Sequence, residues 1–111
     1  MELNIRGRGL QPTPPFRDYV ERQLRHAFHA FDIDRATVRL IRDHGRGPRA
    51  AYGCEIAIAL HHRSLRVNET HSALRVAFVR ATSKARRLLV RFLHRARRRS
   101  RVDRNRKGVM S

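Results

Sequence analysis

Acidic residues are scarce in this sequence of 111 residues, because nine Asp and Glu stand against 26 Lys and Arg, for a formal net charge of +17. No acidic residue lies between Glu69 and Asp103. So much charge of one sign opposes compact folding, which favours a polyanionic partner such as nucleic acid. Lysine is also scarce, occurring only at Lys84 and Lys107. Arginine suits RNA because guanidinium groups bind phosphate oxygens bidentately and stack on bases.

Cysteine and long apolar runs are scarce too. The single cysteine, Cys54, excludes an intramolecular disulfide and a cysteine-rich zinc module, and its place in an alternating apolar run predicts a buried, inert thiol. No apolar stretch approaches the roughly 20 residues that span a bilayer. The first residues also lack the features of a signal peptide. We therefore expect a cytoplasmic protein with no membrane partner.

The periodicity of apolar residues predicts one α+β domain. Period-two alternation favours strands, and a three-to-four-residue period favours helices. The predicted strands cover residues 3–5, 36–42, 52–60 and 65–68, and the predicted helices residues 13–31 and 72–95. Thr13 is expected to cap the first helix, and Thr70 or Ser72 the last. This β-α-β-β-β-α order predicts a four-stranded sheet with both helices on one face, formed by residues 1–96, and a basic, disordered tail at 97–111.

The opposite face of that sheet is expected to stay open. Strict alternation along the strands would place Arg39, Glu55 and Arg66 on it, although a one-residue shift in register would reverse this assignment. The Phe residues occupy core-like positions, which argues against base stacking on the sheet. Recognition is then expected through backbone and shape, which favours structured RNA.

The last predicted helix carries a row of cations opposite its apolar side. They recur every three or four residues and are Arg80, Lys84, Arg87, Arg91, Arg95 and Arg98. Such a row matches the phosphates of an RNA backbone. The alternative is a solvated face, but solvated faces usually interleave Glu with Lys, and no acid occurs here.

Further candidate RNA-binding arginines lie outside that helix. They are Arg6, Arg8, Arg46, Arg49, Arg63 and Arg66. Whether they converge with the helix is not visible from the sequence.

Catalytic and metal sites are not predicted. His26 and His29 share a helical spacing and could approach His61 or His62, but carboxylates or thiols at diagnostic spacing are missing. The acids form no evident acid–base pair, so we expect no enzyme, no metal, no cofactor and no small-molecule substrate. The loop at 45–47 lacks the Walker spacing and its Lys-Ser or Lys-Thr, which favours a plain hairpin connection.

Two segments carry a resemblance to a known family. The opening residues 1–7 and the helix start at 13–21 resemble the ribosome hibernation promoting factors, also called protein Y or ribosome-associated inhibitors, in their short form. The six predicted elements have the same order, so the resemblance covers roughly residues 1–96. The start of the last helix, residues 73–79, departs from the family's acid-Met-Tyr-Ala-Ala-Ile-Asp pattern, which marks a divergent member.

The resemblance implies a fold similar to double-stranded RNA-binding domains and a place in the small ribosomal subunit, where messenger and transfer RNA would bind. Translation would thereby be inhibited during dormancy. The family's contacts correspond to Lys84, Arg87 and Arg91. The partner implied is rRNA of the small subunit, bound by a protein that is monomeric when free. The alternatives left open are a general RNA-binding protein and a nucleoid DNA-binding architectural protein that does not act at the decoding site.

Overall fold

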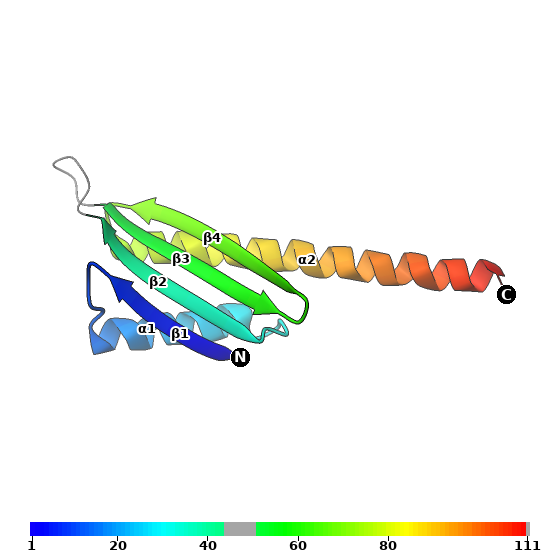
Figure 1. Cartoon of the computed structure of the whole chain (residues 1–111), viewed down its shortest axis with the longest axis horizontal. Helices are drawn as coiled ribbons and strands as arrows, with labels where there is room; N and C mark the ends of the chain where they lie inside the picture. The colour runs from blue at the N-terminus through cyan, green and yellow to red at the C-terminus, as the bar shows by residue number, and fades with distance from the viewer. Residues whose placement is uncertain (44–50, 111) are drawn as a thin grey trace.

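The computed structural model describes the backbone of residues 1–43 and 51–110, and the side chains of residues 1–43 and 51–95. Within these residues the chain forms four strands and two helices (Figure 1). In order they are β1 (Glu2–Arg8), α1 (Pro14–Phe28), β2 (Arg35–Asp43), β3 (Ala51–Leu60), β4 (Arg63–His71) and α2 (Leu74–Met110). The predicted α+β class and the β-α-β-β-β-α order are confirmed.

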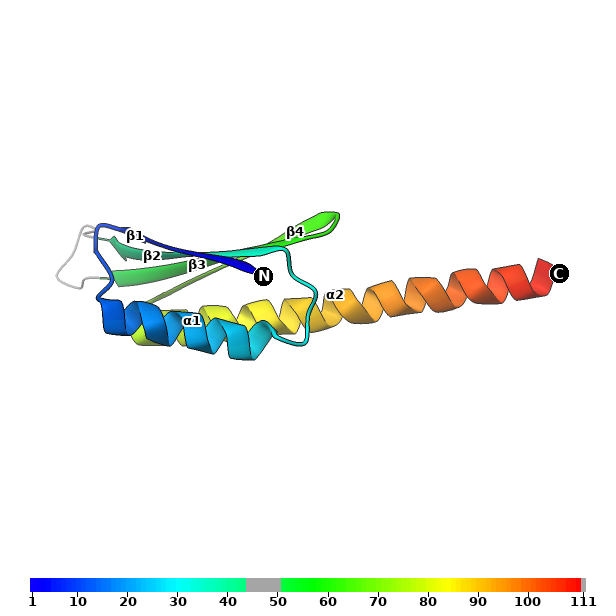
Figure 2. The ribbon, with the colours of Figure 1, turned by 90° about the horizontal axis from the view of Figure 1, so that it is seen from below.

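The strands form one sheet in the order β1-β2-β3-β4. β1 runs parallel to β2, because α1 carries the chain back across the sheet between them. The other two pairings are antiparallel and make a meander. Both helices lie on the same side of the sheet, which leaves the other face uncovered by any helix or strand described here (Figure 2).

The core lies between the sheet and the helices. Val38, Ile56 and Val67 are direct neighbours across β2, β3 and β4, and all three are buried. From the helices, Leu24 and Phe28 of α1 and a longer stripe of α2 pack against them. The buried residues of that stripe are Ala77, Phe78, Ala81, Ala85 and Leu89. One side of α2 is therefore committed to the core along several turns.

The alternate residues of each strand point to the uncovered face, which we call the open face. On the open face Arg6 lies beside Arg39, Arg39 beside Glu55, and Asn4 beside Thr37, by strand register. The outward positions of the last two strands include Glu55, Ala57, Ala59, Arg66 and Asn68. The expectation that Arg39, Glu55 and Arg66 share this face is confirmed by the register.

A tight turn joins β1 to α1. The strand continues through Gly7 to Arg8, further than the early end that we predicted, since glycine does not interrupt the pairing with β2. A Cβ at Gly7 would clash with the Leu10 carbonyl oxygen, and Gly9 has a φ of +74°. Both positions therefore require glycine. Thr13 then caps α1 as predicted, accepting a hydrogen bond from the Phe16 N–H at 3.3 Å.

The bounds of α2 differ from those predicted. Neither Thr70 nor Ser72 caps the helix, because it begins at Leu74 and Ala73 takes the capping position. The Ala73 N–H instead donates to His71 Nδ1 at 3.0 Å. At its other end the helix continues to Met110 rather than ending near residue 95, consistent with the high helix propensity of arginine. The division into a domain and a tail at residue 97 stays a prediction.

Candidate nucleic-acid interface

The outer side of α2 carries the row of cations that the sequence predicted. Arg80, Lys84, Arg87 and Arg91 follow one another at spacings of four, three and four residues, which places them on one side of the helix. All four side chains are exposed. We call these four residues the α2 row. Arg95, one turn further on, is also exposed, and the helical period extends the series to Arg98, whose side chain lies outside the described residues.

Little negative charge offsets the α2 row. Among the described side chains, the only carboxylate within ion-pair distance of it is Glu69, whose Oε1 lies 3.9 Å from Lys84 Nζ. That contact is long and partly exposed, so it contributes little attraction. Because the helix holds no acidic residue between Leu74 and Arg95, the row presents net positive charge to the solvent.

A hollow lies alongside the α2 row. It is a shallow depression of about 550 Å³, open to solvent and lined by Ser83, Arg86, Arg87, Val90 and Arg91. Three arginines thus surround one apolar side chain, Val90, on this part of the helix. Such a lining can accept the sugar as well as the phosphate of a nucleic-acid strand.

Two arginines that we did not single out also lie on α2. Arg86 lines the hollow, and the guanidinium of Arg75 lies 4.5 Å from the centre of the Tyr19 ring. Arg75 and Arg86 are 11 residues apart, as are Arg80 and Arg91. Residues at this spacing lie on the same side of a helix, so the sequence alone could have indicated that Arg86 belongs to a wider basic surface. The contact of Arg75 with Tyr19 depends on the docking of α1, so no local signal in the sequence indicates it.

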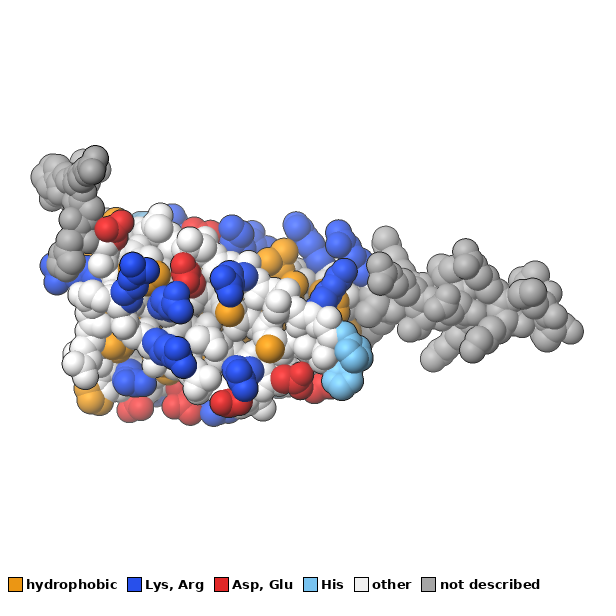
Figure 3. Space-filling model, in the orientation of Figure 1, with side chains coloured by type: hydrophobic (Ala, Val, Ile, Leu, Met, Phe, Trp, Pro, Cys, Tyr) orange, Lys and Arg blue, Asp and Glu red, His pale blue; other side chains and the backbone are white. Residues whose placement is uncertain are grey.

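The predicted site residues on the strands do not all join this surface. Arg63, on the helix side of β4, places its guanidinium 5.5 Å from the centre of the Phe92 ring of α2 and so lies near the row. By strand register, however, Arg6, Arg8 and Arg66 lie on the open face, on the opposite side of the molecule from the helices. Figure 3, in the orientation of Figure 1, shows Lys and Arg side chains spread over that face.

Two predicted site residues lie outside the described part of the chain. They are Arg46 and Arg49, in the connection between β2 and β3. The candidate residues that the structure describes therefore form two basic surfaces, one on α2 and one on the open face.

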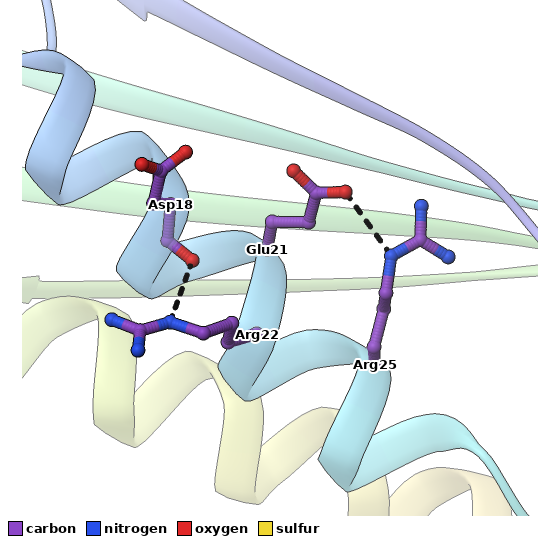
Figure 4. Close-up of polar contacts among 4 residues, drawn as sticks. All are labelled: Asp18, Glu21, Arg22 and Arg25. Carbon is purple, nitrogen blue, oxygen red and sulfur yellow. Dashed lines mark hydrogen bonds and ion pairs between the residues drawn. The ribbon is translucent and has the colours of Figure 1, made fainter.

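The outer side of α1 differs from that of α2 because its cations already have acceptors. Arg25 Nε lies 3.2 Å from Glu21 Oε1, one helical turn away (Figure 4). Arg22 Nε donates to the Asp18 carbonyl oxygen at 3.4 Å. Arg17 donates to the Ile5 carbonyl oxygen of β1 at 3.0 Å. These arginines stabilise the fold locally, and their charges are partly compensated.

The histidines of the described residues do not gather into a metal site. Among residues 1–43 and 51–95, no three His, Cys, Asp or Glu side chains approach closely enough to hold a metal ion. His26 and His29 stack at 6.2 Å between ring centres on the exposed end of α1, and His61 and His62 lie at the β3–β4 turn. The absence of a metal site stays a prediction.

Cys54 is buried, as predicted. Its burial, together with the neighbouring charge of Glu55, raises the pKa of the thiol from 9.0 to about 12. The thiol is thus protonated and unreactive at neutral pH. Within the described residues, no helix combines the length and the apolar character needed to cross a membrane.

Comparison with known proteins decides the family. A family model described as "Sigma 54 modulation protein / S30EA ribosomal protein" matches residues 3–97. The chain belongs to this family. The match includes residues 3–7 of the first segment that resembled hibernation promoting factors and all of the second, at the start of α1, and the predicted resemblance is confirmed.

Solved structures of similar fold agree with the S30EA family. The N-terminal domain of protein Y from Thermus thermophilus superposes with a TM-score of 0.70 at 29% identity, covering 83% of this chain and 99% of that domain. A ribosomal subunit interface protein from Coxiella burnetii also gives a TM-score of 0.70, covering 85% of this chain and 99% of that protein. At 12% identity, the second likeness shows the fold alone. No curated protein sequence matches the chain.

Proposed function

We propose that this protein is a translation inhibitor that binds structured rRNA of the small ribosomal subunit, in the channel used by messenger and transfer RNA, during dormancy. The observation that carries the proposal is the α2 row, four exposed cations on one side of a helix that holds no acidic residue between Leu74 and Arg95. The family and the likeness to protein Y support the ribosome as the partner. The protein is then a cytoplasmic binding factor, monomeric when free, that needs neither a cofactor nor a substrate.

The geometry favours contact with backbone rather than with bases. The α2 row presents charged groups at intervals along the helix, as required to follow successive phosphates. The aromatic rings of Phe16, Tyr19 and Phe78 pack against one another between the helices, with centres 5.7–6.5 Å apart, instead of standing free to stack on bases. Recognition would therefore depend on the shape and charge of folded RNA.

Inhibition follows from occupancy alone. A folded domain with a rigid helix in the channel excludes messenger and transfer RNA sterically, without a chemical step. Because each phosphate that is neutralised releases counterions, the affinity for the small subunit should fall steeply with salt. The same dependence makes the complex reversible when competing RNA ligands return.

Co-sedimentation with ribosomal subunits in sucrose gradients tests the proposal. We expect the wild-type protein to migrate with small subunits, and the triple variant Lys84→Ala, Arg87→Ala, Arg91→Ala to remain at the top of the gradient. These side chains are exposed, so the variant should keep its fold, as circular dichroism would verify. Loss of three phosphate contacts should also lower the slope of log affinity against log salt by about 2–3.

A matched control carries the same change in charge elsewhere. In Arg17→Ala, Arg22→Ala, Arg25→Ala, every substituted arginine lies on α1 and already has an acceptor within the protein, the Ile5 carbonyl oxygen, the Asp18 carbonyl oxygen or Glu21. This control should still co-sediment. If both variants lost co-sedimentation equally, net charge alone would govern binding. If the α2 variant still co-sedimented with small subunits, the proposed surface would be refuted.

A general RNA-binding or nucleoid protein would behave differently in the same experiment. Migration of the wild-type protein outside the ribosomal fractions, or release by duplex DNA as readily as by small-subunit RNA, would contradict the ribosomal assignment.

A further inference from the structure

The open face of the sheet is a second basic surface that the proposed function leaves without a role. By strand register it carries Arg6, Arg8, Arg35, Arg39 and Arg66. No described helix or strand covers it, since both helices lie on the other side (Figure 2). The open face and α2 thus lie on opposite sides of the sheet.

Only part of the charge on the open face is balanced within the protein. Arg35 Nε lies 3.2 Å from Glu2 Oε2, and Arg39 NH1 lies 3.5 Å from Glu55 Oε2. Among the described residues, no carboxylate lies within 4.0 Å of Arg6, Arg8 or Arg66. The connection at 44–50 contains no acidic residue, so the sequence gives it no carboxylate to offer them.

The register also brings like charges together. Arg6 of β1 pairs directly with Arg39 of β2, and Arg8 follows two residues further on the same side of its strand. Like charges placed directly opposite each other in neighbouring strands destabilise a sheet. An anion bound between these guanidinium groups would remove that repulsion, which is what a site for phosphate requires.

Short side chains separate Arg6, Arg8 and Arg39 from Arg66 on the open face. In the neighbouring row of the sheet, Asn4, Thr37, Ala57 and Arg66 succeed one another from β1 to β4. With strands about 4.8 Å apart, this row spans roughly 14 Å. The short side chains of Thr37 and Ala57 lie in this row between Arg66 on β4 and the β1 edge, where Arg6 follows Asn4 by two residues, and they leave room for a polyanion to approach the backbone of the sheet.

The composition of the open face favours RNA over an acidic protein as its occupant. The large exposed apolar side chains of the described residues are Met1, Val79, Val90 and Leu93, and the last three belong to α2. Tyr52 pairs with Arg42 and His71 on the helix side of the sheet. The centre of a protein interface is enriched in aromatic residues and methionine, which the described strands do not present on this face. Arginine with small polar neighbours suits the sugar–phosphate backbone.

We propose that the open face is a second RNA-binding surface, which holds the backbone of one RNA helix while α2 holds another. The protein would then join two RNA segments rather than occupy one. This inference rests on the proposed function only in taking RNA as the ligand of α2.

The stoichiometry of RNA binding tests the inference with the full chain. In analytical ultracentrifugation at low ionic strength with a short RNA duplex of about 16 base pairs, wild-type protein should bind two duplexes. The variant Arg6→Gln, Arg8→Gln, Arg66→Gln should bind one, with the second affinity reduced about tenfold or more. The α2 variant Lys84→Ala, Arg87→Ala, Arg91→Ala should also bind one.

A gain-of-affinity variant keeps the test independent of folding defects. Glu55→Gln removes the carboxylate that balances Arg39, so it should tighten binding of the second duplex and leave the first unchanged. A stoichiometry of one for the wild-type protein, as expected if an acidic protein is the occupant, would overturn the inference. So would two duplexes on the Arg6, Arg8, Arg66 variant. Neither result bears on co-sedimentation of the α2 variant with small subunits, which tests the proposed function separately.

Discussion

The two helices of this protein lie side by side under one sheet, yet their outer surfaces differ in charge. On α1, Arg25 pairs with Glu21 one turn before it, and Arg22 donates to the backbone of its own helix (Figure 4). On α2, the cations recur at the same spacing with no acid beside them in the helix. The same residue type thus supports a fold in one helix and leaves charge free for a partner in the other. The presence or absence of an acid one turn away makes the difference.

The largest expected effect concerns the apolar contact that the two helices share. Phe78 of α2 is 1% exposed and packs edge-on against Phe16 and Tyr19 of α1, with ring centres 6.5 and 5.7 Å apart. Phe78→Ala should lower the free energy of unfolding by about 3–5 kcal/mol, through lost burial and the cavity left behind. Urea denaturation followed by circular dichroism measures this. A cost below 1 kcal/mol would mean that the helices are not docked as described.

The buried thiol under α2 provides the next test. Its pKa is raised from 9.0 to about 12, so at a given pH the folded protein should hold about a thousandfold less thiolate at Cys54 than the unfolded chain. Alkylation at pH 8 should therefore be slow in buffer and fast in denaturant. Rapid alkylation of the folded protein would indicate that α2 leaves the sheet readily.

The raised pKa of Cys54 also determines how the stability of the fold changes with pH. The unfolded thiol ionises near pH 9, whereas the folded thiol keeps its proton up to about pH 12. Above pH 9 the folded state therefore binds more protons than the unfolded state. The stability that burial of the neutral thiol contributes is complete below pH 9 and is lost as the pH rises toward 12. Cys54→Ala should weaken this alkaline loss, as denaturation at pH 7 and pH 10.5 would measure.

A smaller effect is expected from giving α2 the charge arrangement of α1. Ser83 is exposed and precedes Arg87 by four residues, the spacing of Glu21 and Arg25. Ser83→Glu should therefore pair with Arg87 and reduce the affinity for small subunits roughly tenfold, while leaving stability unchanged or slightly higher. Ser83→Gln is the control of matched size. If both variants bind like the wild-type protein, the charge on this side of α2 does not contact RNA.

The reverse change in α1 should have the smallest effect. Glu21→Gln removes the acceptor of Arg25 and adds one net positive charge. Because Arg25 lies outside the α2 row, we expect the affinity to rise by about twofold at most, through long-range attraction that salt suppresses. Filter binding at two salt concentrations measures it. A tenfold rise would place α1 in the interface and remove the contrast between the helices.

Much of this architecture could be predicted from local patterns. The alternation in residues 52–60 and the helical period around Leu24 and Phe28 each require one buried side, and the structure buries those sides. The cap at Thr13 was also predictable from a local pattern, because a hydroxyl before two prolines can accept a hydrogen bond from a free backbone N–H in the first turn of a helix. The start of α2 was not, since β4 extends to His71 and takes Thr70 into the sheet. The apolar alternation in the sequence ends near residue 68, but hydrogen-bonded pairing with β3 continues β4 to His71.

The candidate site was predictable only where it lies on one element. The α2 row follows from the period of a single helix, so its spacing is visible in the sequence. Whether Arg6 or Arg66 joins that row depends on strand order and on the side of the sheet that the helices cover, which are properties of the whole fold. Arg63 lies near α2 and Arg66 lies away from it, although only three residues separate them, because side chains alternate across a strand.

Directed hydroxyl-radical cleavage tests the central claim, that the outer side of α2 lies against rRNA of the small subunit. An iron chelate would be attached at Ser83→Cys on α2 or at Asp18→Cys on α1, while the buried thiol of Cys54 stays unmodified. We predict strong cuts in small-subunit rRNA along the channel for messenger and transfer RNA from position 83, and weak cuts from position 18. Cleavage only from position 18, or cuts outside that channel from both, would contradict the account.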